Sequence, residues 1–159
     1  MIRHAQLDDW EQILSIYAHA REFMRQTGNP NQWKDKDPSP DLLIQDIQKK
    51  QLYLLEDNNA IQAVFALIPG EDPTYSYIDG HWLNDQPYAA IHRVASAGKQ
   101  KGVLAECLIY CTGKYRNIRI DTHQDNKIMQ HLLSKYGFQR CGIIYLENGD
   151  PRIAYHFTQ

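Results

Sequence analysis

Apolar residues recur every three or four positions in the first part of the chain. Over residues 8–26 they fall on one helical face, which predicts an amphipathic helix built on Trp10, Ile13, Leu14, Ile16, Tyr17, Phe23 and Met24. The segment 1–5 before it is expected to be a short strand. Residues 41–50 show a second, shorter helical pattern with Asp41 in its first turn and lysines in its last, the order that a helix dipole favours.

Strand-like segments dominate the rest of the chain. Residues 51–57 and 60–68 are rich in aliphatic and aromatic side chains and flank the turn-like pair Asn58–Asn59, which predicts a β-hairpin. The later elements are expected as strand 88–96, helix 102–112, strand 117–123, helix 126–136, and a closing hairpin of strands 138–148 and 152–158. This order predicts a mixed α/β fold, a mostly antiparallel twisted sheet flanked by helices. Two polar, proline-rich segments, 29–41 and 69–87, are expected to be long loops within it.

Length, charge and cysteine content limit the number of domains and the classes of ligand that the chain is expected to bind. The chain has 159 residues, 43% of them hydrophobic, which suits one domain over 1–159. A formal charge of −2 and a pI near 6.4 provide no overall cationic field for nucleic acid or an anionic membrane, so any anion site must be local. Charged residues interrupt the N-terminal segment and no apolar run reaches membrane-spanning length, so a soluble, cytoplasmic protein is expected. The chain has three cysteines, an odd number: Cys107, Cys111 and Cys141. They are interpreted as core thiols, with no metal site expected.

The segment "GKQKGVLAECL", residues 98–108, places two cations where a helix is predicted to begin. Lys99 and Lys101 flank Gln100 just before Gly102, although a helix N-terminus favours anions by a few tenths of a kcal/mol. A bound anion would reverse that balance, and a glycine lets backbone N–H groups approach a phosphate closely. The alternative is a solvated basic loop that contains a glycine. The segment fits neither GxxxxGK[ST] nor GxGxxG, which disfavours an NTPase or a dinucleotide oxidoreductase.

Two longer stretches, "IHRVASAGKQKGVLAECLIYC" and "IRIDTHQDNKIMQHLLSKYGF", resemble the acyl-CoA-binding core of the GNAT family of N-acetyltransferases. That family joins a strand to a helix through a loop of the type [QR]xxGx[GA]. Here Lys99 takes the Gln/Arg place, Gly102 the first glycine, and Leu104 stands where a second small residue is usual. Asn126 precedes Gly137–Phe138 by the family's usual interval, and the predicted order of elements is similar to the family's fold over the whole chain.

The resemblance implies an acyl-CoA N-acyltransferase fold and an acetyl-CoA-dependent N-acetyltransferase. Backbone N–H groups over the loop would bind the pyrophosphate of coenzyme A, from residues Lys99, Gln100, Lys101, Gly102, Val103 and Leu104. Backbone groups of Val94 and Ser96 would pair with the pantetheine arm like an added strand. Asn126 would bind the same arm from the opposite side. A plain helix N-cap is the structural alternative for Asn126, and both roles can hold together.

The family's chemistry needs a neutral amine, a polarised thioester carbonyl and a proton for the departing thiolate. The tyrosine that often supplies this proton lies seven residues after the asparagine, and Leu133 stands in that place here. Tyr136, three residues further on, is shifted by about 4.5 Å and turned by about 60°. The candidate bases are His92, expected on the strand face opposite Arg93, together with His123 and Tyr145. Each of the three has a packing role as its alternative.

An acceptor site is expected where the resemblance places it, on the first two helices, their connecting loop and the later loop. Those regions hold the proposed substrate-binding residues Arg21, Trp33, Tyr75, Tyr77 and Trp82. We interpret them as an aromatic-lined pocket for a small amine or an amino acid, with Arg21 available to a carboxylate. In the alternative interpretation the tryptophans pin long loops to the body.

Two functions stay in competition at this point. The first is transfer of an acetyl group to an amine by direct attack on the thioester. The second is a non-catalytic acyl-CoA-binding or regulatory module on the same fold. The leucine at position 133 and the incomplete match of residues 99–104 to the family's loop pattern are compatible with this second function. The expected partner is a small-molecule amine, with no nucleic acid and no membrane, and a homodimer stays an open alternative.

Overall fold

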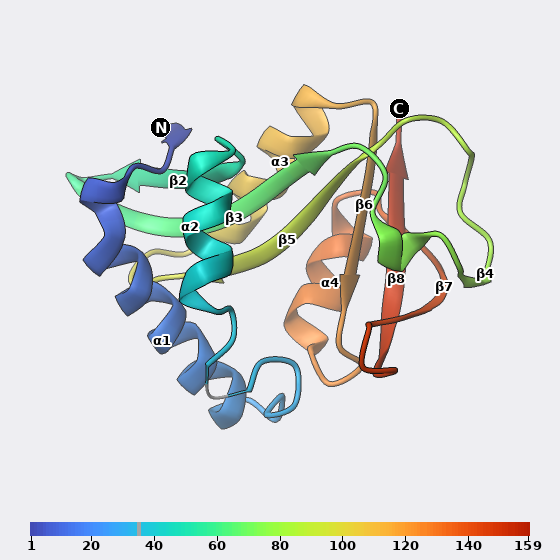
Figure 1. The fold of residues 1–159 in the computed structure, drawn as a ribbon, viewed down its shortest axis with the longest axis horizontal. Coiled ribbons are helices and arrows are strands. Elements are labelled where there is room, and N and C mark those ends of the chain that lie inside the picture. The colour runs from blue at the N-terminus through green and yellow to red at the C-terminus, as the bar shows by residue number, and fades with distance from the viewer. Residues whose placement is uncertain (35) are drawn as a thin grey trace.

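An eight-stranded sheet in the order β1-β2-β3-β5-β6-β8-β7-β4 forms the centre of the computed structural model, which describes residues 1–34 and 36–159 (Figure 1). The strands are β1 (Ile2–His4), β2 (Leu52–Asp57), β3 (Ala60–Pro69), β4 (Asp79–Gly80), β5 (Ala89–Ser96), β6 (Asn117–Thr122), β7 (Gln139–Tyr145) and β8 (Pro151–Thr158). Neighbouring strands are antiparallel except for the parallel pair β5 and β6. The predicted fold class, a mixed and mostly antiparallel sheet flanked by helices, is confirmed.

The helices cover both faces of this sheet. They are α1 (Trp10–Gln26), α2 (Pro40–Gln48), α3 (Val103–Lys114) and α4 (Lys127–Lys135), with short 3₁₀ turns η1 (Leu7–Asp9) and η2 (Pro73–Tyr75). Figure 1 shows α1 and α2 on one face and α3 and α4 behind the sheet. The predicted helices and long strands are therefore all present, whereas the two 3₁₀ turns and β4 were not anticipated.

Alternation along β2 and β3 divides the core into two layers. Leu52 and Leu54 pack with α1 and α2, while Tyr53 and Leu55 pack with α3 and α4. Period-2 alternation is what a strand buried on both faces requires. Complete burial of one such leucine contributes about 1.5–3 kcal/mol, so the hairpin ties both helical layers to one sheet.

The turn of the hairpin and two of the three cysteines agree with the expectations drawn from the sequence. Asn58 and Asn59 both adopt positive φ, 54° and 59°, as the tight turn of a hairpin demands. Cys107 and Cys111 are buried in the core, and burial raises the pKa of both thiols, whereas Cys141 is partly exposed. Within the described residues, no helix has the length and apolar character needed to cross a membrane, and no cluster of His, Cys, Asp and Glu side chains is arranged to hold a metal ion.

Candidate active site

The parallel strands β5 and β6 separate near the middle of the sheet. Their pairing runs only from Ala89 opposite Ile118 to Ile91 opposite Ile120. Beyond this point β6 continues along β8, while β5 runs on to Ser96 beside β3. The separation leaves one edge of β5 without a strand partner over residues 92–96, and backbone groups on such an edge are available to a ligand.

A bulge shapes this open part of β5. Arg93 has φ of +55°, and the register between β3 and β5 shifts beside it. The Tyr17 hydroxyl donates to the Arg93 carbonyl at 2.7 Å, and the Arg93 guanidinium donates to both oxygens of Asp46 at 2.7 and 3.0 Å. Asp46 is only 1% exposed and also accepts a hydrogen bond from Gln51 at 2.9 Å. The predicted placement of His92 and Arg93 on opposite faces is wrong, because the bulge interrupts strand alternation and both line one cleft.

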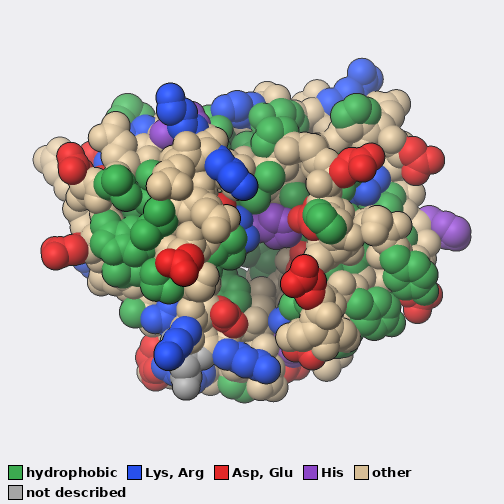
Figure 2. Space-filling model, viewed as in Figure 1, with side chains coloured by type: hydrophobic (Ala, Val, Ile, Leu, Met, Phe, Trp, Pro, Cys, Tyr) green, Lys and Arg blue, Asp and Glu red, His purple; other side chains and the backbone are tan. Residues whose placement is uncertain are grey.

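Two adjoining spaces flank the bulge. The first, here called the apolar cavity, has a volume of about 190 Å³ and is lined by residues of α1, β5, α3 and α4, among them Phe23, Met24, Val94, Ser96, Leu104, Asn126 and Met129. The second, here called the polar cleft, has a volume of about 670 Å³ and is lined by Trp33, Asp72, His92, Asp121, Arg152 and others. The two share Met24, Val94, Asn126 and Met129 in their linings, so they adjoin. Figure 2 shows the molecule hollowed near the centre of this face, with acidic and basic side chains around the opening.

The loop before α3 has the features expected of an anion site. Gly102 is the N-cap residue of α3, its φ is +81°, and no side chain caps the helix. A Cβ at Gly102 would meet no atom within 4 Å, so the space beside this residue is open. The first N–H groups of α3 have no side-chain cap. Lys99 and Lys101 are exposed beside it, and Gln100 is tied back by a 2.8 Å hydrogen bond to Asp57.

Asn126 lies at the junction of the two spaces. Its Oδ1 accepts from the backbone N–H of Met129 at 3.0 Å, which is an N-cap contact for α4. Its Nδ2 donates to Oε1 of Gln32 at 2.9 Å, and Gln32 also accepts from Asn29 at 2.8 Å. The capping role given above as the structural alternative is therefore present. The ligand-binding role of Asn126 stays a prediction, and its position in both linings is compatible with it.

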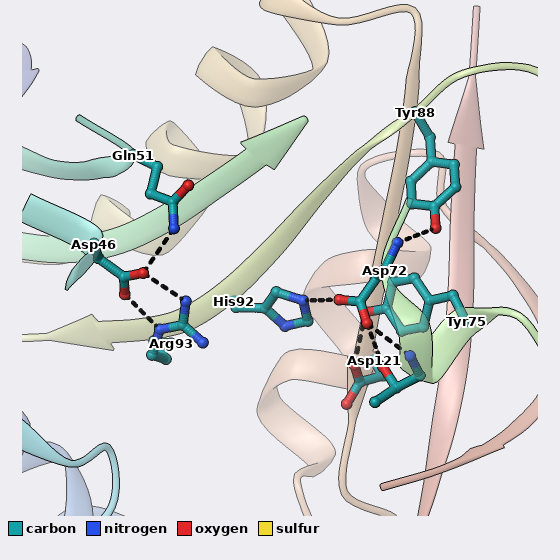
Figure 3. A network of polar contacts seen from close by, with 9 residues as sticks. Asp46, Gln51, Asp72, Tyr75, Tyr88, His92, Arg93 and Asp121 are labelled. Carbon is teal, nitrogen blue, oxygen red and sulfur yellow. Dashed lines mark hydrogen bonds and ion pairs between the residues drawn. The ribbon is translucent and has the colours of Figure 1, made fainter. Parts of the chain in front are cut away.

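A histidine and an aspartate meet at the wall of the polar cleft (Figure 3). His92 Nε2 lies 2.6 Å from Asp72 Oδ2. Burial works to raise the pKa of Asp72, but hydrogen bonds from His92 and Thr74 outweigh it and lower that pKa to about 2. Asp72 is thus an ionised acceptor at neutral pH, so neutral His92 must carry its proton on Nε2. The lone pair then resides on Nδ1, which has no hydrogen-bond partner within residues 1–34 and 36–159.

Asp72, which comes from the long loop after β3, was not among the residues predicted from the sequence. Asp72 is the N-cap of η2 and accepts from Thr74 N at 2.9 Å and from Thr74 Oγ1 at 2.7 Å. Its own N–H donates to the Tyr88 hydroxyl at 2.8 Å. An aspartate directly before Pro73 and two residues before a threonine is a recognisable cap signal, and it was the only sign of order in this loop.

Known proteins match this chain by structure but not by family model or curated sequence. No model of a protein family matches this sequence, and no curated protein matches it. Among solved structures, a GNAT-family acetyltransferase from Streptococcus agalactiae is 30% identical and superposes with a TM-score of 0.89. That match covers 100% of this chain and 95% of the other. This chain belongs to the GNAT family.

Other solved structures agree at the level of the fold. A GNAT-family acetyltransferase from Listeria monocytogenes is 17% identical, with a TM-score of 0.75 and coverage of 100% of this chain and 94% of that one. A chain of the NatC complex, whose structure contains a Gag peptide and CoA, is 14% identical, with a TM-score of 0.64 and coverage of 100% and 98%. The resemblance inferred from the two sequence stretches is confirmed, and with it acetyl transfer as the reaction of the family.

A leucine, Leu133, stands at the position of the GNAT tyrosine. Leu133 is 0% exposed and packs in the core under α3 and α4, and Tyr136 is partly buried against that same core. Within the described part of the chain, no tyrosine lines the apolar cavity or the polar cleft. A proton for the thiolate therefore has to come from another group or from water.

The other two predicted bases lie away from the polar cleft. His123 borders a separate small cavity of about 40 Å³, its Nδ1 accepts from the Asp125 N–H at 3.0 Å, and burial together with Arg152 lowers its pKa. Tyr145 is 43% exposed on β7 and its ring lies 6.3 Å from that of Tyr77. The geometry therefore favours His92 of the three.

The predicted acceptor residues separate into two groups. Trp33 lines the polar cleft and also packs on the Tyr17 ring at 5.6 Å, so it both lines the cleft and pins its loop. Tyr75 and Trp82, with ring centres 5.1 Å apart, line a neighbouring groove of about 630 Å³ instead. The Tyr75 hydroxyl donates to Asp121 at 2.6 Å, and burial together with that carboxylate raises the pKa of Tyr75 well above its usual value.

Two predicted acceptor residues lie outside both spaces. Tyr77 is 66% exposed on the outer surface. Arg21 donates to the backbone carbonyl of Asp37 at 3.0 Å and lines neither space, because its side chain is directed to the loop that follows α1. A carboxylate-binding arginine in the polar cleft would have to be a different one.

Proposed function

We propose that this GNAT protein transfers an acetyl group from acetyl-CoA to the amine of a small molecule or an amino acid, by direct attack of the amine on the thioester. The observation that carries the proposal is the hydrogen bond between His92 and Asp72 at the wall of the polar cleft. It leaves an unpartnered imidazole lone pair at the wall of a cleft that adjoins the apolar cavity.

The chain's own features fit the cofactor. The uncapped N-terminus of α3, the open space over Gly102 and the two exposed lysines suit a pyrophosphate. The unpaired edge of β5 at Val94 and Ser96 and the apolar cavity suit the pantetheine arm. When bound, acetyl-CoA supplies a thioester carbonyl to the amine and a thiol as the leaving group. A thiol has a pKa near 8.5, so its departure near neutral pH needs little help from an acid, in keeping with a cleft that no tyrosine lines.

Each remaining role falls to a named group. His92 Nδ1 takes a proton from the incoming ammonium or amine, a role that typically contributes a factor of about 10²–10⁴ in rate. Asp72 is a positioning residue, since it holds the imidazole in one tautomer and stabilises the charged form during the transfer. Backbone N–H groups of β5 beside the bulge are assigned to polarising the carbonyl, and Tyr17 and Asp46 hold the bulge in place.

Two measurements on the purified protein test the proposal. We expect coenzyme A to raise the melting temperature, because a ligand that binds only the folded state stabilises it by mass action. We then expect thiol release from acetyl-CoA when a library of amines is added, and a loss of about 10²–10⁴ in that rate for His92→Gln. Stabilisation without thiol release would favour the non-catalytic acyl-CoA-binding module, and no stabilisation at high concentration would refute both functions.

A further inference from the structure

A buried arginine at the start of β8 has no counter-ion. Arg152 is 6% exposed, and no ion pair reaches it within the described residues. Its Nη1 donates to the Pro151 carbonyl at 2.8 Å and its Nη2 to the Gln32 carbonyl at 3.3 Å. A guanidinium has five N–H donors, so three of them have no partner in residues 1–34 and 36–159. A buried cation in this state is costly unless something compensates its charge.

Arg152 lines the polar cleft, and its surroundings differ from those of the cleft's other arginine. Arg93 has a counter-ion, because its Nε and Nη2 donate to the two carboxylate oxygens of Asp46. The carboxylates of Asp121 and Asp150 attract Arg152 only from beyond ion-pair distance, and Asp121 is already bound by the Tyr75 hydroxyl. The free donors of Arg152 are therefore left for a group that enters the cleft.

The position of Arg152 relates it to the reacting end of the cofactor. Gln32, whose carbonyl accepts from Arg152, binds the side chain of Asn126 through its own amide oxygen. Asn126 in turn lies at the junction of the apolar cavity and the polar cleft. Arg152 is thus linked through one residue, Gln32, to Asn126, where the proposed cofactor arm would enter the cleft that contains His92.

We propose that the acceptor is an amino acid, whose carboxylate is bound by Arg152 while its amine faces His92 Nδ1. This inference rests on the proposed function. The planar fork of a guanidinium matches a carboxylate in a bidentate manner, which an ammonium on lysine does not. The charges at the rim, Lys49, Glu71 and Glu147, are exposed and therefore screened by salt. Inside the cleft, the carboxylates of Asp72 and Asp121 are engaged by His92 and Tyr75, and the free donors of Arg152 are available to an anion.

The first test uses the wild-type protein with matched acceptors. A panel of amino acids is compared with the amines that result from their decarboxylation, and kcat/KM is measured by thiol release. A charge-assisted hydrogen bond predicts a preference of about ten- to one-hundredfold for the amino acid. Equal rates for the two members of each pair, or a preference for the amine, would overturn the inference and leave the proposed function standing.

Two variants assign the preference to one residue. In Arg152→Gln we expect the ratio of kcat/KM between acid and amine to fall to about one, and Arg152→Lys should retain part of it. Arg140→Gln is the matched control, because Arg140 is an exposed arginine on the partner strand of the same hairpin, outside the polar cleft. A preference that persists in Arg152→Gln would refute the assignment.

Binding gives a readout that does not depend on turnover. Titration of an amino acid into the protein loaded with coenzyme A should show an affinity about ten- to one-hundredfold above that of its decarboxylated amine, and Arg152→Gln should lose the difference. Such binding without any thiol release would support the carboxylate site and reject the proposed transfer. Thiol release without this difference in binding or rate would reject the carboxylate site.

Discussion

The contact between His92 and Asp72 permits a double-mutant test of the proposed base. His92→Gln removes the only imidazole of the polar cleft within the described residues and should lower kcat/KM by about 10²–10⁴. Asp72→Asn keeps an oxygen for the Thr74 N–H but removes the charge 2.6 Å from Nε2. A hydrogen bond to a charged group is worth about 1.5–3 kcal/mol, which corresponds to a loss of about ten- to one-hundredfold. The asparagine can also turn its amide toward Nε2 and favour the wrong tautomer.

Because Asp72 acts only through His92, the two losses should not add. We expect the double variant to be no slower than His92→Gln alone. The assay is the initial rate of thiol release at fixed pH, with urea unfolding of each variant to show that the fold is retained. His131→Gln and Asp8→Asn serve as matched controls, since both side chains are exposed and outside the polar cleft. Additive losses, or full activity in Asp72→Asn, would refute the positioning role.

Three further predictions concern the cofactor loop, a buried histidine and the core. Gly102→Val should lower the affinity for coenzyme A more than tenfold, because a branched side chain at φ +81° displaces the first N–H groups of α3. Gly149→Val is the control, since it is equally strained at φ +88° but lies in a remote turn. Unchanged affinity of Gly102→Val, measured by thermal shift, would contradict the proposed pyrophosphate site before α3. Burial and Arg119 lower the pKa of His156 to about 4, so only the unfolded chain takes up this proton as pH falls below about 6.5. The contribution of neutral His156 to the free energy of unfolding is fully present above that pH and is lost toward pH 4, by about 3 kcal/mol at most. Urea unfolding at several pH values measures it, and a pH dependence in His156→Gln equal to that of the wild type would refute this. Leu133→Tyr should destabilise the fold by about 1–3 kcal/mol without raising turnover, since the position is sealed in the core; faster thiol release would show that the ring reaches the cleft.

The sequence was sufficient wherever a local pattern determines the structure. The 3.6-residue periodicity of α1 and the alternation of β2 and β3 each place a run of side chains against the core, and many residues contribute to each signal. Asn126 illustrates a single-residue case, because a helix N-cap depends on contacts within three positions. The spacing from Asn126 to the Gly137–Phe138 pair was one part of the resemblance to the GNAT family, which the comparison with solved structures confirmed.

The parts of the site that escaped prediction depend on contacts distant in sequence. Asp72 reaches His92 across 20 positions, and the orientation of its loop is determined by the Tyr88 hydroxyl and η2 rather than by any periodicity. The carboxylate-binding role was assigned to Arg21 because it lies in the expected region, but the rotation of α1 directs it to Asp37. Arg152 looked like an ordinary strand residue, and only the assembled sheet shows that its charge is buried with no ion-pair partner among the described residues.

The bulge at Arg93 explains how one strand contributes to both the apolar cavity and the polar cleft. In a regular strand, Val94 would share the face of His92 and Ala95 would lie opposite. The structure reverses this: Val94 packs against the core under α3 and α4, and Ala95 against the core under α1 and α2. A non-glycine residue at positive φ costs about 1–3 kcal/mol, so surrounding contacts must hold it.

Those contacts are the buried pair with Asp46 and the hydrogen bond from Tyr17. A buried ion pair contributes little net stability compared with apolar packing, but it enforces one geometry because either partner alone would be a buried, uncompensated charge. Both contacts come from the helices α1 and α2, on the side of the sheet where the polar cleft opens. The same two helices that cover the sheet therefore also set the backbone of β5 at the point where acetyl transfer is proposed to occur.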